Sequence, residues 1–298
     1  MPSTTDLEQF LITGLSLGGV YALSGVGMVV LYRATGVLYL AFGAVGAMGA
    51  LISWQLSQQD GWNIWLSFVA AILFGGVITL VYGMIFGPAL AGRDPLVKAT
   101  ATLGLLLILL GVMDLLWPSS GGASRALTIP TDNDTFQVGQ ISVTYTNVIA
   151  LVLGLVITIV TAAFLRFTKL GTAMRAMAND REITATLGVP VRRVEAAAWF
   201  GCGLLSGLAG ILLADLVALD ATTLTFLVLS SLAATLIARL RSIPITFVAA
   251  VVIGTVDALI TPIQSLTNYR DMTPFVFAAI ALLIQNRRRT ITIGRQGV

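Results

Sequence analysis

The sequence contains no histidine and only one cysteine among its 298 residues. The missing imidazole excludes histidine acid–base chemistry, histidine metal ligands and a serine–histidine catalytic triad. A single cysteine cannot form a disulfide within the chain, and Cys202 lies in an apolar run typical of a buried packing residue. We therefore expect no catalytic residues and no metal site in this chain.

Charge is also scarce. Charged residues make up 10% of the chain and hydrophobic residues 57%, with a mean hydropathy of +0.93. Soluble domains carry about 25% charged residues, so a water-soluble fold could not cover itself with so few. The apolar runs are long and lack the alternation of barrel strands. We predict an all-α, polytopic membrane protein with one domain over residues 1–298, in contact with lipid.

Nine apolar runs approach the length of about 20 residues that a helix needs to cross a bilayer. They cover residues 9–31, 37–56, 64–90, 98–117, 147–165, 197–218, 221–238, 243–264 and 274–286. The apolar part of the seventh run, residues 226–238, and the ninth run are short. Interrupted spans of this kind point to a substrate route or to tilted, peripheral helices. We expect about eight or nine spans.

Basic residues predict the orientation. With the N-terminus outside, all but two of the 17 Lys and Arg residues fall on the cytoplasmic side, the exceptions being Arg125 and Arg270. Because cytoplasmic loops carry an excess of Lys and Arg, we predict an N-out, C-in topology. The acidic N-terminus lacks the basic start and cleavage site of a secretory signal, so the first run should remain as a membrane helix. Basic and aromatic residues do not interleave, so we expect no nucleic-acid partner.

Two polar segments interrupt the apolar runs. The outer loop, residues 118–146, is rich in Ser, Thr, Gly and Asp, and its end from Phe136 to Tyr145 alternates like a small hairpin. It is either a plain connector or an outer face for a partner protein. The second segment, residues 166–195, is strongly basic and is predicted to form a cytoplasmic loop.

The basic segment carries its own helix signals. Asn179 stands three residues before Glu182, which predicts a capping box and a helix over 180–187. Gly188 provides the position after the helix, and Pro190 prevents continuation. A shorter helix is expected over 172–178. The segment is therefore either a shaped docking element or a basic loop that binds anionic lipid headgroups.

Two blocks resemble a known family. One is G-T-A-M-R-A-M-A-N-D-R-E-I-T-A-T-L-G-V, residues 171–189, followed by R-R-V-E-A-A-A-W-F and G-L-A-G-I-L-L-A. The other is G-L-S-L-G-G-V-Y-A-L-S-G-V-G-M-V-V-L-Y, residues 14–32. Both resemble the inner-membrane permeases of branched-chain amino acid ABC transporters.

The resemblance implies a type II ABC importer fold in a bacterial cytoplasmic membrane. Two permeases, homologous or identical, would stand side by side above two ATP-binding subunits, and an outer substrate-binding protein would deliver the solute. ATP and Mg would bind the partner subunits, leaving this chain without a cofactor. Residues 171–190 would form the coupling segment that docks the ATPase, with these candidates: Gly171, Arg175, Asn179, Asp180, Glu182 and Gly188.

The chain departs from the family pattern at two places. Where the family reads like G-x-x-N-F-A-H-G, this chain reads G-V-L-Y-L-A-F-G, which puts Tyr39 and Phe42 in place of polar residues and keeps Gly43. The family's V-L-G-G-L-G-S-x-P-G becomes T-L-I-A-R-L-R-S-I-P-I, in which Arg239 and Arg241 replace glycines. Tyr39, Phe42 and Gly43 are candidates for the translocation path. The resemblance implies a small amino-acid-like cargo, and the aromatic pair points to a more apolar one.

Asp257 is the carboxylate that we place near the middle of the 243–264 span. Gly254, Asp257, Thr261 and Gln264 share one helical face, and a carboxylate inside a membrane is costly unless it faces protein or water. Asp257, Thr261 and Gln264 are therefore further path candidates. A structural role for Asp257, by capping or pairing, is an equal alternative.

Three functions compete. An ABC importer permease would borrow its ATPase, because this chain has no Walker motif. A stand-alone ion-coupled carrier or channel would use Asp257. An intramembrane protease is weakly supported, since the chain has neither a Gly-Asp dipeptide nor a histidine. We favour the permease, because a lone carrier has no need of a capped cytoplasmic docking helix.

Overall fold

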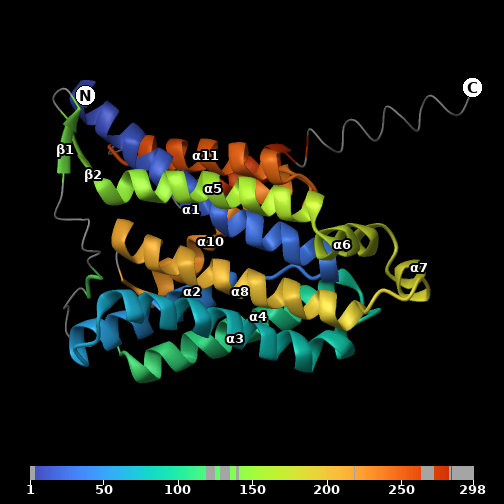
Figure 1. The fold of residues 1–298 in the computed structure, drawn as a ribbon. Coiled ribbons are helices and arrows are strands. Elements are labelled where there is room, and N and C mark those ends of the chain that lie inside the picture. Colours follow the sequence, from blue (N-terminus) through green and yellow to red (C-terminus); the bar gives the residue numbers. More distant parts are fainter. Residues whose placement is uncertain are drawn as a thin grey trace, which may run out of the picture.

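The computed structural model describes residues 4–118, 125–127, 135–138, 141–217, 219–262, 272–281 and 283. These residues form a helical bundle with one small hairpin (Figure 1). The helices are α1 Thr4–Thr35, α2 Phe42–Trp54, α3 Ile64–Leu90, α4 Pro95–Leu116, α5 Tyr145–Phe167, α6 Lys169–Asn179, α7 Arg181–Thr186, α8 Val191–Leu216, α9 Ala221–Phe226, α10 Val228–Ile237 and α11 Ile243–Ile260. A π-helical turn, η1 Gln55–Gln59, continues α2, and residues 273–281 are helical.

Within the described residues, six helices are long and apolar enough to cross a membrane. They are Glu8–Thr35, Ile64–Leu90, Pro95–Leu116, Tyr145–Phe167, Val191–Leu216 and Ile243–Ile260. The chain is thus a polytopic helical membrane protein, as its composition predicts. The total of eight or nine spans and the N-out orientation remain predictions.

The expected span 37–56 is shorter as a helix, because α2 begins only at Phe42. Gly36 has a left-handed conformation, with φ +66°, that ends α1, and the chain then runs irregularly to Ala41. Thr102 of α4 satisfies this irregular backbone. Its Oγ1 donates to the Leu38 carbonyl at 2.9 Å and accepts from the Leu40 N–H at 3.1 Å. Non-helical backbone at membrane depth is tolerated where the protein satisfies its polar groups in this way.

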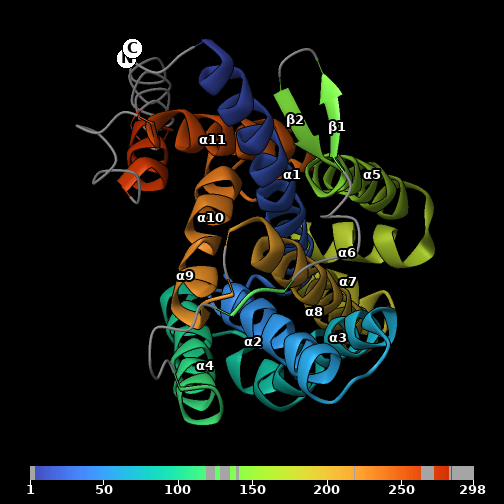
Figure 2. The ribbon, with the colours of Figure 1, turned by 90° about the vertical axis from the view of Figure 1, so that its left-hand side faces the viewer.

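Helix α1 lies inside the bundle, between α11, α5, α8 and α10 (Figure 2). It is apolar on every side, which is typical of a helix surrounded by protein. Glycines permit its close packing. A Cβ at Gly18 would lie 2.6 Å from the Val251 Cα of α11, and one at Gly19 would lie 2.7 Å from the Leu151 Cα of α5. Small residues at such crossings let membrane helices approach backbone to backbone.

The two ends of the bundle differ (Figure 1). The hairpin β1 Thr135–Val138 and β2 Ile141–Thr144 lies at the end where α1 begins, in antiparallel register with Thr135 opposite Thr144. This confirms the hairpin expected near Phe136 to Tyr145. Helices α6 and α7 lie at the opposite end. One end therefore presents a strand pair and the other a pair of short helices.

Candidate functional site

Helix α6 packs against the bundle through one buried face. The Thr168 Oγ1 accepts from the Gly171 N–H at 3.0 Å and caps its start. Gly171, Met174 and Met177 form its buried face, and α6 packs on α1 and α5. A Cβ at Gly171 would collide with the backbone of α5 at Leu165, so this position needs glycine. The expected helix over 172–178 is confirmed and is longer by a few residues, because Thr168 starts it earlier.

Helix α7 has a different cap from the predicted one. Asp180, not Asn179, is the N-cap, and its Oδ1 accepts from the Ile183 N–H at 2.9 Å. Asn179 is the last residue of α6, so the predicted capping box between Asn179 and Glu182 is wrong. The physical reason is that α6 continues through Asn179, and the chain first becomes extended at Asp180, where φ is −153°. Asp caps a helix as well as Asn does.

The end of α7 agrees with the prediction to within a residue. The helix ends at Thr186, and Gly188 has φ +82°, the left-handed conformation expected after a helix. The Gly188 N–H donates to the Ala185 carbonyl at 3.0 Å. Two large apolar side chains, Ile183 within α7 and Leu187 just after it, are 59% and 77% exposed. They lie at the end of the bundle rather than along its sides.

Charged contacts connect this pair of helices to the rest of the chain. The Arg181 guanidinium of α7 donates from Nε to the Glu195 Oε1 of α8 at 2.9 Å, and its Nη2 lies 2.9 Å from the same oxygen. Arg175 donates to the Arg166 carbonyl at 3.4 Å. The helices therefore contact the ends of α5 and α8, two long helices of the bundle.

The weak span 221–238 is divided, as its short apolar part indicates. Asp220 caps α9 by accepting from the Thr223 N–H at 2.8 Å, and Leu227 separates α9 from α10. After α10, Arg239 and Leu240 both have positive φ, +54° and +56°. Arg239 thus stands in a backbone conformation that favours glycine, at a position where the resembling family carries glycine.

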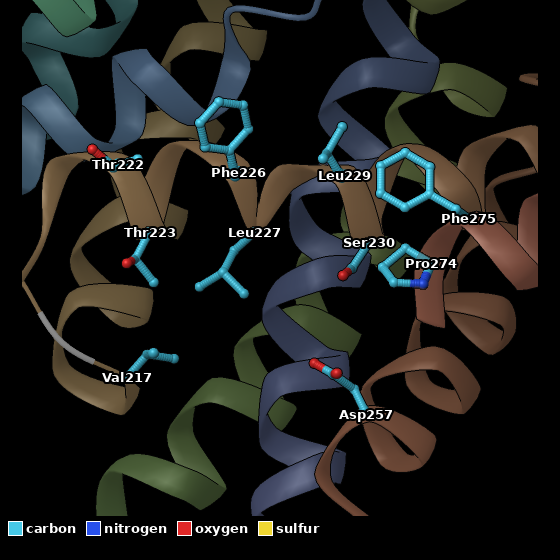
Figure 3. A pocket seen from close by; sticks show the side chains of 10 residues that line it. All are labelled: Val217, Thr222, Thr223, Phe226, Leu227, Leu229, Ser230, Asp257, Pro274 and Phe275. Atoms are coloured by element: carbon cyan, nitrogen blue, oxygen red, sulfur yellow. The ribbon is translucent and has the colours of Figure 1, made fainter. Parts of the chain in front are cut away.

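A cavity of about 440 Å³ lies beside the junction between α9 and α10 (Figure 3). It is lined by Val217, Thr222, Thr223, Phe226, Leu227, Leu229, Ser230, Asp257, Pro274 and Phe275. The lining therefore combines one carboxylate and three hydroxyls with aromatic and aliphatic side chains. A volume of this size falls within the range of small-molecule sites, about 300–1,000 Å³.

Asp257 lies in the last turn of α11, which ends at Ile260. Its predicted position near the middle of a longer span is therefore wrong, because the helix stops before the apolar run does. Asp257 is 4% exposed, and the Tyr21 hydroxyl of α1 donates to its Oδ2 at 3.4 Å. The Thr261 Oγ1 donates to the Asp257 carbonyl at 3.2 Å, so these two candidates adjoin. Gln264 lies outside the described residues.

The other path candidates lie elsewhere. Tyr39 is 1% exposed and packs edge-on against Trp199 of α8, with ring centroids 5.5 Å apart. Its hydroxyl lies 3.3 Å from the Thr79 Oγ1 of α3. Phe42 and Gly43 line another, much smaller void between α1, α2, α8, α9 and the start of α10. None of the three lines the 440 Å³ cavity.

Sequence reasoning did not select the hydroxyls of Thr222, Thr223 and Ser230 as site residues. A signal for two of them was present, since the threonines make the polar end of the weak span. Ser230 has no comparable signal, because a serine in an apolar helix, here next to Ser231, is most often a packing residue. Its place on the cavity follows only from the junction at Leu227.

Comparison with known proteins places these observations in a family. Residues 10–284 match the family described as branched-chain amino acid transport system, permease component. The chain belongs to this family. This confirms the resemblance seen in residues 14–32 and 171–189. As a member of this permease family, the chain is a transport subunit and a multi-pass membrane protein, not an enzyme.

Individual relatives are distant but align along most of the chain. LivH of Salmonella typhimurium, from a high-affinity branched-chain amino acid transport system, is 24% identical over 93% of this chain and 95% of that protein. A probable LivH permease of Methanocaldococcus jannaschii is 25% identical over 85% of this chain and 81% of its own length. BraD of Pseudomonas aeruginosa, also from a high-affinity branched-chain amino acid transport system, is 23% identical over 100% of this chain and 99% of that protein. The family similarity therefore includes both the α6–α7 helices and the cavity.

Proposed function

We propose that this permease forms the translocation path of an ATP-driven importer and docks an ATP-hydrolysing subunit through residues 171–190. The α6–α7 pair carries the proposal: it is capped and packed on the bundle, yet exposes Ile183 and Leu187. The partners would be two ATP-binding subunits, a second permease and an outer substrate-binding protein. ATP and Mg would bind the partner ATPases, and this chain would hold no cofactor.

Exposed apolar side chains on α7 support docking to a protein. Burying a Leu or Ile side chain fully is worth about 1.5–3 kcal/mol, so Ile183 and Leu187 together can stabilise an interface substantially. Basic residues of the same segment, including Arg175 and Arg192, are suited to an acidic rim on the partner. A loop that only binds lipid headgroups would need the charges but not the fixed caps.

The contacts of α7 also supply a mechanical connection. The ion pair between Arg181 and Glu195 links α7 to the start of α8, and the other end of α8 adjoins Val217 of the cavity. A displacement of the docked ATPase would then move α8 as a rigid rod. Gly171, Asn179, Glu182 and Gly188 would shape the segment, while Asp180 fixes the start of α7.

The cargo that we propose is a small, amino-acid-like or apolar organic solute. Two of the relatives described above are named as high-affinity branched-chain amino acid permeases. Tyr39 and Phe42, in place of the polar residues of the family pattern, favour a less polar path. The proposed path residues are Tyr39, Phe42, Gly43, Asp257, Thr261 and Gln264.

The test compares an Ile183→Ser, Leu187→Ser variant with the wild-type chain purified from native membranes in mild detergent. Wild-type protein should carry ATPase subunits and a second permease, and the double variant should lose the ATPase. Ile183→Leu keeps an apolar side chain and serves as the matched control that retains it. Equal thermal stability of the three proteins would show that the fold is intact.

Two results would contradict the proposal. One is ATPase retained at wild-type levels by the double variant. The other is an intact chain that purifies alone and transports an ion in liposomes in an Asp257-dependent manner, which would establish the stand-alone carrier instead.

A further inference from the structure

Three arginines approach one another at the end of the bundle where α6 and α7 lie (Figure 1). Arg33 belongs to the last turn of α1, Arg175 to α6, and Arg241 to the turn before α11. The Arg33 guanidinium donates to the backbone carbonyl of Arg241, which connects the end of α1 to this turn. The charges of Arg175 and Arg241 both lie close enough to repel that of Arg33. Together these residues form the arginine cluster.

No carboxylate among the described residues pairs with the arginine cluster. The ion pair at this end of the bundle, Arg181 with Glu195, joins α7 to α8 instead. Arg175 donates to a backbone carbonyl and a threonine hydroxyl. Arg33 is partly buried, and a guanidinium has five N–H donors. Because a partly buried charge without a counter-charge is costly, the cluster is suited to bind an anion.

The depth of the cluster indicates which anion is available. Arg33 lies in the last turn of α1, which is long and apolar enough to cross a membrane, so its guanidinium lies near the boundary with water. Phospholipid phosphates lie at the same level, and arginine side chains reach toward them. Guanidinium groups bind phosphate oxygens in pairs, and basic pockets between membrane helices bind anionic headgroups.

An apolar stripe continues from the cluster along α11. Ile245, Val248 and Val252 are exposed and follow one another at intervals of three and four residues, so they share one side of the helix. The stripe starts one helical turn after Arg241. A soluble anion would gain nothing from this stripe, whereas the acyl chains of a phospholipid would cover it. The charge and the apolar surface together therefore favour a lipid.

We propose that the arginine cluster and the stripe on α11 form a binding site for an anionic phospholipid. Arg33 and Arg241 bind the phosphate group, Arg175 adds its positive charge, and an acyl chain lies along the stripe. The negative charge of the lipid offsets the repulsion within the cluster, so a bound lipid stabilises the contact between α1, α6 and the start of α11. This inference goes beyond the proposed importer function and does not depend on it.

Native mass spectrometry of the full chain, released from detergent, measures the affinity of three added probes. Phosphatidylglycerol has a net negative charge, phosphatidylethanolamine with the same acyl chains has none, and glycerol phosphate lacks the chains. Wild-type protein should bind phosphatidylglycerol about tenfold more tightly than phosphatidylethanolamine. Glycerol phosphate should show no saturable binding. Arg241→Gln should weaken phosphatidylglycerol about fivefold, the effect expected of one arginine at a membrane surface.

Arg241→Gln is the primary variant because it preserves the fold contact: Arg33 donates to the backbone carbonyl of Arg241, which the substitution leaves in place. Arg33→Gln should weaken phosphatidylglycerol by a similar factor. Arg93→Gln, at an exposed position between α3 and α4, removes the same charge away from the cluster and should bind the lipid like wild type. Equal melting temperatures of the variants in detergent check the fold.

Four results would overturn the proposal. Phosphatidylglycerol affinity could be unchanged in Arg241→Gln, or glycerol phosphate could bind as tightly as the lipid, which would assign the cluster to a soluble phosphate. An equal loss of lipid affinity in Arg93→Gln would show general surface attraction instead of a site. Loss of copurified ATPase from Arg241→Gln, at unchanged lipid affinity, would assign the cluster to an acidic surface of the protein partner.

Discussion

Single glycines determine how closely the helices of this permease approach. Gly46 of α2 faces Gly210 of α8, and Gly75 of α3 faces Gly203 of the same helix. A Cβ at Gly210 would collide with the Gly46 carbonyl, whereas Gly201 of α8 has open space where its Cβ would be. One helix therefore offers both a required glycine and an unconstrained one.

Gly210→Ala should lower the free energy of unfolding by about 1–3 kcal/mol, because the added methyl forces α2 and α8 apart. Thermal unfolding of the purified chain in detergent measures the change. Gly201→Ala is the matched control on the same helix and should be neutral or slightly stabilising, since Ala is the better helix former. Equal melting temperatures for the two variants would contradict the close approach.

Arg239 provides a second prediction at this scale. Its left-handed conformation, with φ +54°, costs a non-glycine residue about 1–2 kcal/mol. Arg239→Gly should therefore stabilise the chain by up to about 1 kcal/mol, after part of the gain is offset by the flexibility of unfolded glycine. Arg241→Gly, at a residue without positive φ, should not stabilise. Chemical unfolding of both variants separates them, and a destabilised Arg239→Gly protein would argue against strain.

At the scale of elements, caps and chain breaks determine where the short helices begin and end. The sequence signals correctly predict that α6 and α7 exist, that Gly188 follows α7, and that the weak span is divided. They misplace the cap by one residue, because Asn179 and Asp180 are equally good caps and only the packing of α6 on α1 and α5 extends it through Asn179. Local chemistry predicts an element, and tertiary contacts determine where it starts.

Asp180→Ala should weaken α7 by about 1 kcal/mol, because the Ile183 N–H loses its acceptor. Hydrogen exchange at the amides of α7 should accelerate about fivefold, which is the rate change that this energy represents. Asn179→Ala should leave α7 unchanged, and Asp180→Asn should preserve most of the protection. If exchange were faster in Asn179→Ala than in Asp180→Ala, Asn179 would be the cap of α7 after all, which would contradict the cap at Asp180.

At the scale of the whole molecule, hydropathy and positive charge predict the class and an orientation, and the helices confirm the class. The candidate site could be predicted only in part. Asp257 and the polar threonines are visible as exceptions in apolar runs, but the cavity forms only where residues 217–230 meet Asp257 of α11 and the later residues Pro274 and Phe275. Tyr39 and Phe42 stand out against the family pattern, yet their burial against α3 and α8 emerges only from the fold.

The orientation can be tested with the single native cysteine removed. In a Cys202→Ala background, Trp62→Cys lies after η1 and Leu187→Cys lies after α7, both at exposed positions. An N-out topology predicts that a membrane-impermeant maleimide labels Trp62→Cys in intact cells and labels Leu187→Cys only after lysis. The reverse pattern would invert the assignment of inside and outside.

The packing of α1 against α11 has a consequence for biogenesis. Gly14 and Gly18 fit against the backbone of α11 around Gly254, so an early helix depends on one made near the end of synthesis. Until α11 leaves the ribosome and inserts, Gly14 and Gly18 on the α11-facing side of α1 must face lipid or a chaperone. Contacts of such long sequence separation form slowly. A chain shortened before Ile243 should therefore insert its early helices yet be degraded, because the side of α1 that packs on α11 is left without its partner.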